Sequence, residues 1–210
     1  MPQPPTEQNR FSEAAATWDD SPVRRERARE MAQHLRELIQ EHQLSTGLDY
    51  GAGTGLTSFY LQEDLQEITL MDAAPGMIEV AQQRIDKLGI SHIQARQGDW
   101  LEADFAETFD LIYILMTLHH IQDIEGILSA FHRHLSPGGW LTIADLVEED
   151  GSFHAEYPDF DGHNGFNEQE LTRQLQHTGF TNVTSRHFFE LKNEQGRTYP
   201  LFLLLAQKAD

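Results

Sequence analysis

The chain has 210 residues, of which 39% are hydrophobic and 23% are charged, and its formal net charge is −19 at pH 7. This length permits one domain with a sizeable core, and the acidic surface disfavours nucleic acids and anionic membranes as partners. Cysteine is absent, and the sequence has neither a signal-peptide pattern nor an apolar run of membrane-spanning length, so we expect a cytoplasmic protein without disulfides or thiolate metal sites.

Residues 1–45 predict a helical arm. The polar stretch 1–20 carries two aromatic residues, Phe11 and Trp18, and is followed by Ser21-Pro22, a typical helix start. Apolar residues then recur at helical spacing. The two aromatic side chains either close over a ligand as a lid or anchor the arm to the core, and the sequence leaves both interpretations open.

From residue 46 onward, strand-like runs alternate with helical segments. The expected strands are GLDYG, EITLMD, HIQARQGD, FDLIYILM and GWLTIADL, and the expected helices start near Gly55, Pro75, Asp123 and Asn167. Regular alternation of this kind predicts a parallel sheet with helices on both faces.

The end of the chain departs from this alternation. Two strand-like runs, NVTSRHFFEL and TYPLFLLLAQK, are separated only by the short turn KNEQGR. A turn this short is typical of a hairpin, so the last strand should be antiparallel. Residues 147–166 form one long irregular segment, and loops of this length in a compact domain are usually functional or disordered. We expect this insertion to lie on the substrate side and to form part of the acceptor pocket, with a solvated acidic loop as the alternative.

The stretch LDYGAGTGL places glycines at positions 51, 53 and 55, between a predicted strand and a predicted helix. Backbone N–H groups at such a junction bind anionic or polar groups. A dinucleotide fingerprint would have its third glycine where Leu56 stands, and the nearby Asp49 is a poor match for a pyrophosphate. A nicotinamide-dependent oxidoreductase is therefore disfavoured.

Acidic residues follow the next two predicted strands. Asp72 ends the run EITLMD, and Asp99 stands in the run QGDW, beside Trp100. Carboxyl ends of parallel strands form the ligand edge of an open α/β sheet, where an acid accepts hydrogen bonds from a ribose. Asp72 is thus a candidate ribose ligand and Asp99 a candidate adenine ligand, whereas a helix cap and a turn acid are the structural alternatives.

Together with FDLIYILMTLHHI and LSPGGWLTIADL, these motifs resemble the class I S-adenosylmethionine-dependent methyltransferases of the small-molecule branch, over residues 46–208. The resemblance implies one domain, 1–210, with a three-layer Rossmann-like, seven-stranded, mostly parallel sheet whose last strand is antiparallel. It implies S-adenosylmethionine as cofactor and S-adenosylhomocysteine as product. The cofactor-binding residues that it implies are Asp49, Gly51, Ala52, Gly53, Asp72, Ala73, Met77, Asp99, Trp100 and Leu115.

The methyl acceptor is expected to be a small molecule, with neither nucleic acid nor membrane as partner, in a monomer or homodimer. His119 and His120 follow the fourth predicted strand and are the candidate general bases, or else they shape the pocket without moving a proton. The candidate substrate-side residues are Trp18, His154, Tyr157 and His163. The histidines lack a tight ligand spacing, so we expect no metal. A cofactor-binding protein without transferase activity is the alternative function.

Overall fold

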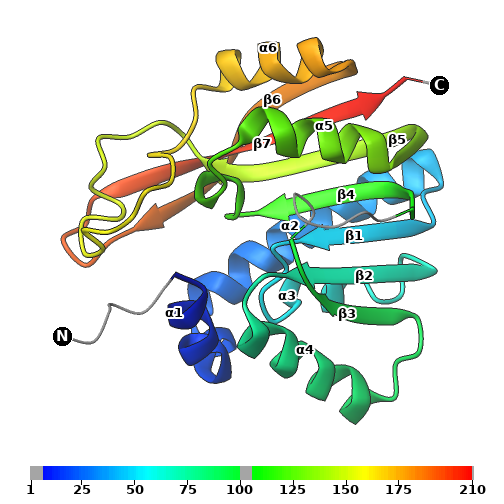
Figure 1. The fold of residues 1–210 in the computed structure, drawn as a ribbon, viewed down its shortest axis with the longest axis horizontal. Helices are drawn as coiled ribbons and strands as arrows, with labels where there is room; N and C mark the ends of the chain where they lie inside the picture. Colours follow the sequence, from blue (N-terminus) through cyan, green and yellow to red (C-terminus); the bar gives the residue numbers. More distant parts are fainter. Residues whose placement is uncertain (1–6, 100–105, 210) are drawn as a thin grey trace. The chain divides into compact units, whose positions relative to one another are not determined.

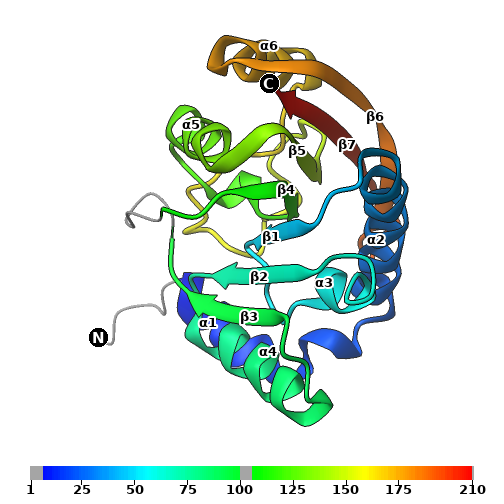
Figure 2. The ribbon, with the colours of Figure 1, turned by 90° about the vertical axis from the view of Figure 1, so that its right-hand side faces the viewer.

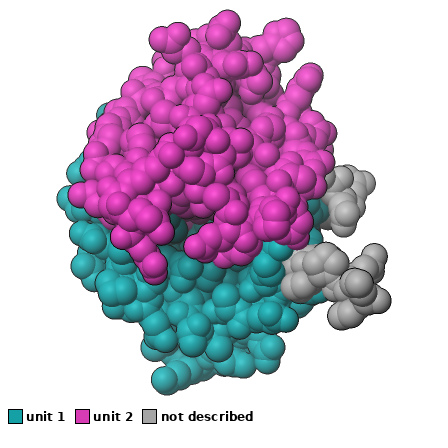
Figure 3. Space-filling view, turned by 90° about the vertical axis from the view of Figure 1, so that its left-hand side faces the viewer, with its two compact units in different colours: residues 1–104 teal, residues 105–210 magenta. Residues whose placement is uncertain are grey.

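The computed structural model describes residues 7–99 and 106–209. The chain divides into two compact units, Met1–Asp104 and Phe105–Asp210, which are coloured separately in Figure 3. Of the predicted site residues, Trp100 lies outside the described ranges.

The first unit holds the N-terminal helices and three strands (Figure 1). Its elements are α1 (Glu7–Ala14), η1 (Ala15–Asp20), α2 (Pro22–His42), β1 (Thr46–Tyr50), α3 (Leu56–Tyr60), β2 (Glu67–Asp72), α4 (Pro75–Leu88) and β3 (Ile93–Gln97). Strand β2 is parallel to both β1 and β3, with Tyr50 opposite Met71 and Asp72 opposite Gln97. The parallel register therefore brings the carboxyl ends of these three strands to one edge.

Two helices of this unit follow directly from their sequences. Helix α2 begins after Ser21, whose hydroxyl accepts a hydrogen bond from Arg24 N, and Pro22 occupies its first turn. Helix α4 begins at Pro75 and ends before Gly89, which adopts a left-handed conformation with φ of 65°. Both helices begin at the predicted prolines because an N-terminal proline has no N–H group to leave unpaired.

The second unit holds the remaining four strands. Its elements are β4 (Phe109–Leu115), η2 (Leu118–His120), α5 (Ile124–His134), β5 (Leu135–Leu146), α6 (Glu168–Thr178), β6 (Phe180–Lys192) and β7 (Thr198–Lys208). Strand β5 is parallel to β4, whereas β7 is antiparallel to both β5 and β6. The core is apolar, since Leu111, Ile143 and Leu203 are fully buried. The short turn before β7 thus reverses the last strand, as predicted.

Residues 147–166, the insertion, leave the sheet after β5 and return before α6. Their ends lie together, because Val147 forms an isolated parallel bridge with Phe166 and Glu149 N donates to Asn164 O at 2.8 Å. The insertion appears as the yellow segment between β5 and α6 in Figure 1. It is therefore a closed loop whose two ends are joined by backbone contacts.

The seven strands make one mixed sheet in the order β3-β2-β1-β4-β5-β7-β6 (Figures 1 and 2). This confirms the predicted fold class, a Rossmann-like sheet with an antiparallel last strand and flanking helices. Among the described residues, no helix combines the length and apolar character needed to cross a membrane.

Candidate functional site

The glycine loop between β1 and α3 has a backbone that only glycine adopts easily. Gly51, Gly53 and Gly55 have φ values of 68°, 56° and 80°. A Cβ atom on Gly55 would also lie 2.8 Å from Leu70 Cδ1, so a side chain there would force Leu70 to shift. The loop is tied to β2, since Gly51 N and Ala52 N both donate to Met71 O, at 2.8 and 3.0 Å. The alternating glycines are therefore explained by conformation first, and they leave the loop backbone without bulky side chains.

Asp72 connects this loop to the start of helix α4. Its Oδ2 accepts a hydrogen bond from Gly53 N at 2.7 Å, and its Oδ1 accepts one from Ala74 N at 2.8 Å. Ala73, another predicted site residue, stands between Asp72 and Ala74 in the sequence. Asp72 thus organises the glycine loop, whereas the N-cap of α4 is Ala74 and no side chain caps this helix, so the helix-cap interpretation of Asp72 is not confirmed.

Asp99 and Asp49 each have a partner that the sequence analysis did not identify. Tyr50, at the end of β1, donates its hydroxyl to Asp99 Oδ1 at 2.6 Å. Ser58, in α3, donates its hydroxyl to Asp49 Oδ2 at 2.6 Å, and both of these residues are buried. No sequence spacing signals these pairs, because each joins different elements.

Burial raises the pKa of the Asp49 carboxyl to about 7; the Ser58 hydrogen bond opposes this rise, and the negative charge of Asp72 adds to it. The first unit therefore has an acid that gains or loses a proton near neutral pH. It lies at the carboxyl end of β1, immediately before the glycine loop.

The N-terminal arm packs onto this region. Trp18 meets Phe11 edge-on at 5.8 Å, and a Cβ atom on Gly53 would lie 3.7 Å from Trp18 Nε1 and 3.8 Å from Met77 Sδ. Thr54, in the loop, donates its hydroxyl to Asp19 at 2.5 Å. Trp18 therefore lies beside two residues predicted to bind the cofactor.

In the second unit, the loop after β4 carries Leu115, Met116 and the two predicted histidines. Leu115 is half-buried at the end of β4. Met116 has a left-handed φ of 57°, and its N–H donates to Ala144 O at 2.8 Å. A positive φ is uncommon for a residue other than glycine, and it often marks functional loops. The turn directs the chain from the sheet into η2.

His119 forms a buried pair with Asp145, at the end of β5. The distance from His119 Nδ1 to Asp145 Oδ1 is 2.6 Å, and the two side chains are 1% and 0% exposed. Burial acts to raise the pKa of Asp145, but the charge and the hydrogen bond of His119 outweigh it, so the pKa is lowered. The carboxylate stays ionised and orients the imidazole of His119.

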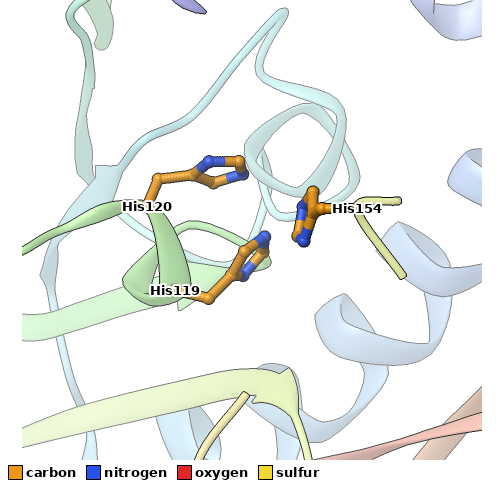
Figure 4. Close-up of side chains that lie close together, drawn as sticks. All are labelled: His119, His120 and His154. Atoms are coloured by element: carbon orange, nitrogen blue, oxygen red, sulfur yellow. The ribbon is translucent and has the colours of Figure 1, made fainter. Parts of the chain in front are cut away.

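The insertion brings His154 to this pair (Figure 4). The ring centroids of His119 and His120 are 4.0 Å apart, and those of His119 and His154 are 5.1 Å apart. His154 also stacks on Phe160 at 3.8 Å. The predicted catalytic pair and one predicted substrate-side residue therefore lie together.

The other two residues predicted on the insertion differ from His154. His163 N donates to His119 O at 2.7 Å, so its backbone helps to hold η2, and its Nε2 is buried without a hydrogen-bond partner. Tyr157 is 45% exposed, and its N–H donates to His154 O at 2.8 Å. The insertion thus contributes a histidine to the cluster and contributes backbone bonds around it.

The chain is similar to known proteins in family, in sequence and in fold. Residues 23–185 match the model of a family described as "Methyltransferase domain". The chain belongs to this family. The match confirms the resemblance to class I S-adenosylmethionine-dependent methyltransferases that the motifs carry.

Relatives of known name are similar over parts of their length. The chain is 28% identical to phosphoethanolamine N-methyltransferase 1 of Arabidopsis thaliana, over 70% of this chain and 32% of that protein. It is 34% identical to a ubiquinone biosynthesis O-methyltransferase of Azorhizobium caulinodans, over 50% of this chain and 42% of that protein. In both alignments the chain spans less than half of the relative.

Among solved structures, the N-methyltransferase NodS from Bradyrhizobium japonicum WM9 in complex with S-adenosyl-L-homocysteine has a TM-score of 0.73. It is 22% identical in sequence, and the alignment covers 96% of this chain and 97% of that chain. At this identity the likeness shows the shared fold.

Proposed function

We propose that this methyltransferase-family chain transfers a methyl group from S-adenosylmethionine to a small-molecule acceptor by in-line displacement. The observation that carries the proposal is the junction of the glycine loop with Asp72, at the carboxyl end of β2, whose carboxylate accepts from Gly53 N at 2.7 Å. An acid at this edge of an open α/β sheet is placed to accept from ribose hydroxyls. Asp99, held by Tyr50 at 2.6 Å, follows on the neighbouring strand end, where we assign it to the adenine. The loop glycines and Ala52 are assigned to the methionine part.

In the transfer, a lone pair of the acceptor attacks the methyl carbon, and the carbon–sulfur bond breaks with its electron pair passing to sulfur. The products are the methylated acceptor and S-adenosylhomocysteine. An acceptor with an O–H or N–H group also loses a proton, and the candidate bases are His119 and His120. The Asp145 carboxylate, 2.6 Å from His119 Nδ1, orients that imidazole as a positioning residue. Catalysis otherwise comes from alignment of the two reactants and exclusion of water.

Two features support a small acceptor. Relatives named for phosphoethanolamine and for ubiquinone biosynthesis act on small molecules or their precursors, as their names state. The net charge of −19 opposes binding of a nucleic-acid backbone. A protein that binds the cofactor without transferring its methyl group remains the alternative that the experiment distinguishes.

Calorimetric titration with S-adenosylmethionine, S-adenosylhomocysteine and NAD tests the cofactor. We expect both adenosyl compounds to bind and NAD not to bind. Asp72→Asn should weaken binding by about ten- to a hundredfold, the effect of losing hydrogen bonds to a charged group. The matched control is Asp86→Asn, because Asp86 is exposed on α4 and should leave affinity unchanged.

Tight NAD binding, or equal affinities of the Asp72→Asn variant and the parent chain, would overturn the cofactor assignment. Transfer of a labelled methyl group to a panel of hydroxyl and amine metabolites then separates the enzyme from a cofactor-binding protein. Binding without any transfer across the panel favours the alternative.

A further inference from the structure

Three imidazoles gather within the second unit, from two segments that are distant in sequence. His119 and His120 come from η2, and His154 comes from the insertion, with their rings turned toward one another in Figure 4. One ligating nitrogen from each residue lies within 4.8 Å of the other two. We propose that this cluster binds a divalent transition metal, with Zn²⁺ as the reference ion.

The imidazoles of the cluster are largely shielded from water, because His119 is 1% exposed and His154 is 9% exposed. A neutral imidazole supplies a nitrogen lone pair, which is the form that metals bind. Imidazole nitrogen suits zinc, copper, iron and nickel, and the chain has no cysteine to add a thiolate.

The buried Asp145 carboxylate completes a carboxylate–histidine arrangement. Since His119 Nδ1 lies 2.6 Å from Asp145 Oδ1, the nitrogen that His119 would offer a metal is Nε2. Metal-bound histidines commonly bond a carboxylate through their other nitrogen, which orients the ring and increases its basicity as a ligand. Asp145 therefore acts on the proposed metal through His119.

The turn that carries His154 is ordered by its own hydrogen bonds. The Glu149 carboxylate accepts from the backbone N–H groups of Gly151, Ser152 and Phe153, at 2.8 to 3.2 Å. The Ser152 hydroxyl lies 2.9 Å from the hydroxyl of Tyr199, in β7. The approach of His154 to η2 is thus supported from the sheet.

The far end of the insertion contacts η2 directly. His163 N donates to His119 O at 2.7 Å, and a Cβ atom on Gly162 would lie 2.2 Å from the same oxygen. Only glycine permits so close an approach at position 162. The backbone at Gly162 and His163 is therefore packed against η2.

Zinc–imidazole bonds are about 2.0–2.1 Å long, so tetrahedral coordination needs nitrogens about 3.3–3.4 Å apart. The nitrogens of the cluster lie within 4.8 Å of one another, so binding requires them to approach further. Three protein ligands leave one coordination position open, as in catalytic zinc sites.

The role of this open position rests on the proposed function, although the binding of the metal does not. A hydroxyl acceptor held at this position would lose its proton to water more readily, because the cation would stabilise the alkoxide. The metal would therefore favour a small alcohol or phenol as acceptor.

The test is titration of the full chain, without a histidine tag and dialysed against EDTA, with Co²⁺ as an optical probe. We expect one tightly bound ion per chain, with the intense visible absorption of tetrahedral cobalt, and displacement of that absorption by Zn²⁺. His154→Ala and His120→Ala should each weaken Co²⁺ binding at least tenfold. The matched control, His187→Ala, removes an exposed histidine of β6 and should bind like the parent chain.

Equal cobalt affinity and absorption in the parent chain and both cluster variants would overturn the proposal, as would an absence of tetrahedral absorption in the parent chain. Circular dichroism and S-adenosylhomocysteine calorimetry of each variant establish that it is folded. The two proposals fail separately: a parent chain with tetrahedral cobalt but no heat with S-adenosylhomocysteine retains the metal site and loses the proposed function. A parent chain that binds S-adenosylhomocysteine but gives no tetrahedral cobalt absorption retains the proposed function and loses only the metal site.

Discussion

The end of β1 and the end of β5 each bury a carboxylate, and their surroundings have opposite effects on its pKa. Asp49 is hydrogen-bonded to the neutral Ser58 hydroxyl and lies near the acid Asp72, and burial raises its pKa to about 7. Asp145 is equally buried, but the charge and hydrogen bond of His119 overcome the effect of burial and lower its pKa. The charge of the partner decides the protonation state of a buried acid, because burial penalises both carboxylates.

The largest expected effect on stability comes from removal of the Asp145 carboxylate. Asp145→Ala leaves the buried His119 imidazole without its carboxylate, and we expect a loss of about 3–5 kcal/mol in the free energy of unfolding. Urea unfolding at pH 7 measures it, with Asp86→Ala as the exposed control. A loss no larger than that of the control would show that the pair contributes nothing to stability.

The raised pKa of the buried Asp49 carboxyl predicts that the stability of the fold depends on pH. Its folded pKa of about 7 exceeds the ordinary value of 3.8, so the folded chain holds a proton that the unfolded chain releases. Stability from this group is complete below pH 3.8 and falls as pH rises to about 7; over three pKa units the loss amounts to about 4 kcal/mol.

Asp49→Asn should remove this decline. Urea unfolding at pH 5 and pH 8 compares the variant with the parent chain, and the difference between the two should grow in the variant's favour toward pH 8. For Asp145 the sign is opposite: its lowered pKa adds stability above pH 3.8, which is lost as pH falls through the folded pKa. Parallel pH profiles of the Asp49→Asn variant and the parent chain would contradict the assignment for Asp49.

The smallest expected effect comes from Ser58. Ser58→Ala removes the hydroxyl that donates to Asp49 at 2.6 Å, and an unsatisfied buried acceptor costs about 1–3 kcal/mol. Because that hydrogen bond lowers the Asp49 pKa, the free energy of unfolding of the variant should continue to fall with rising pH above pH 7. The unfolding profile is compared with that of Ser91→Ala, an exposed control. If stability stopped falling at the same pH in the variant and in the parent chain, Ser58 would not influence the pKa of Asp49.

Much of the fold was predictable from local patterns. The predicted range Pro75–Leu88 is the observed helix α4, because a proline start, a glycine end and apolar residues at helical spacing all agree. The run EITLMD is strand β2, and the hairpin predicted at the C-terminus is the pair β6 and β7. Strand β5 begins at Leu135, earlier than the predicted glycine at 139, since pairing with Phe109 of β4 extends it.

The candidate sites were only partly predictable. The strand-end rule identified Asp72 and Asp99, and the glycine spacing identified the loop, because both depend on neighbours in sequence. The partners Tyr50, Ser58 and Asp145 were missed, since each lies on a different element from the residue that it contacts. The expectation of no metal depended on spacing along the chain and stays a prediction; the approach of His154 to His119 was not visible in that spacing.

The sequence by itself determined the order of helices and strands, the reversed last strand, the glycine loop and the family. These depend on periodicity, turn residues and local backbone preference, which act over a few positions. Only the tertiary structure decided which carboxylate meets a histidine, which meets a hydroxyl, and that the insertion brings a third imidazole to η2. Those contacts join segments far apart in the chain, and the packing of the sheet and its loops selects them.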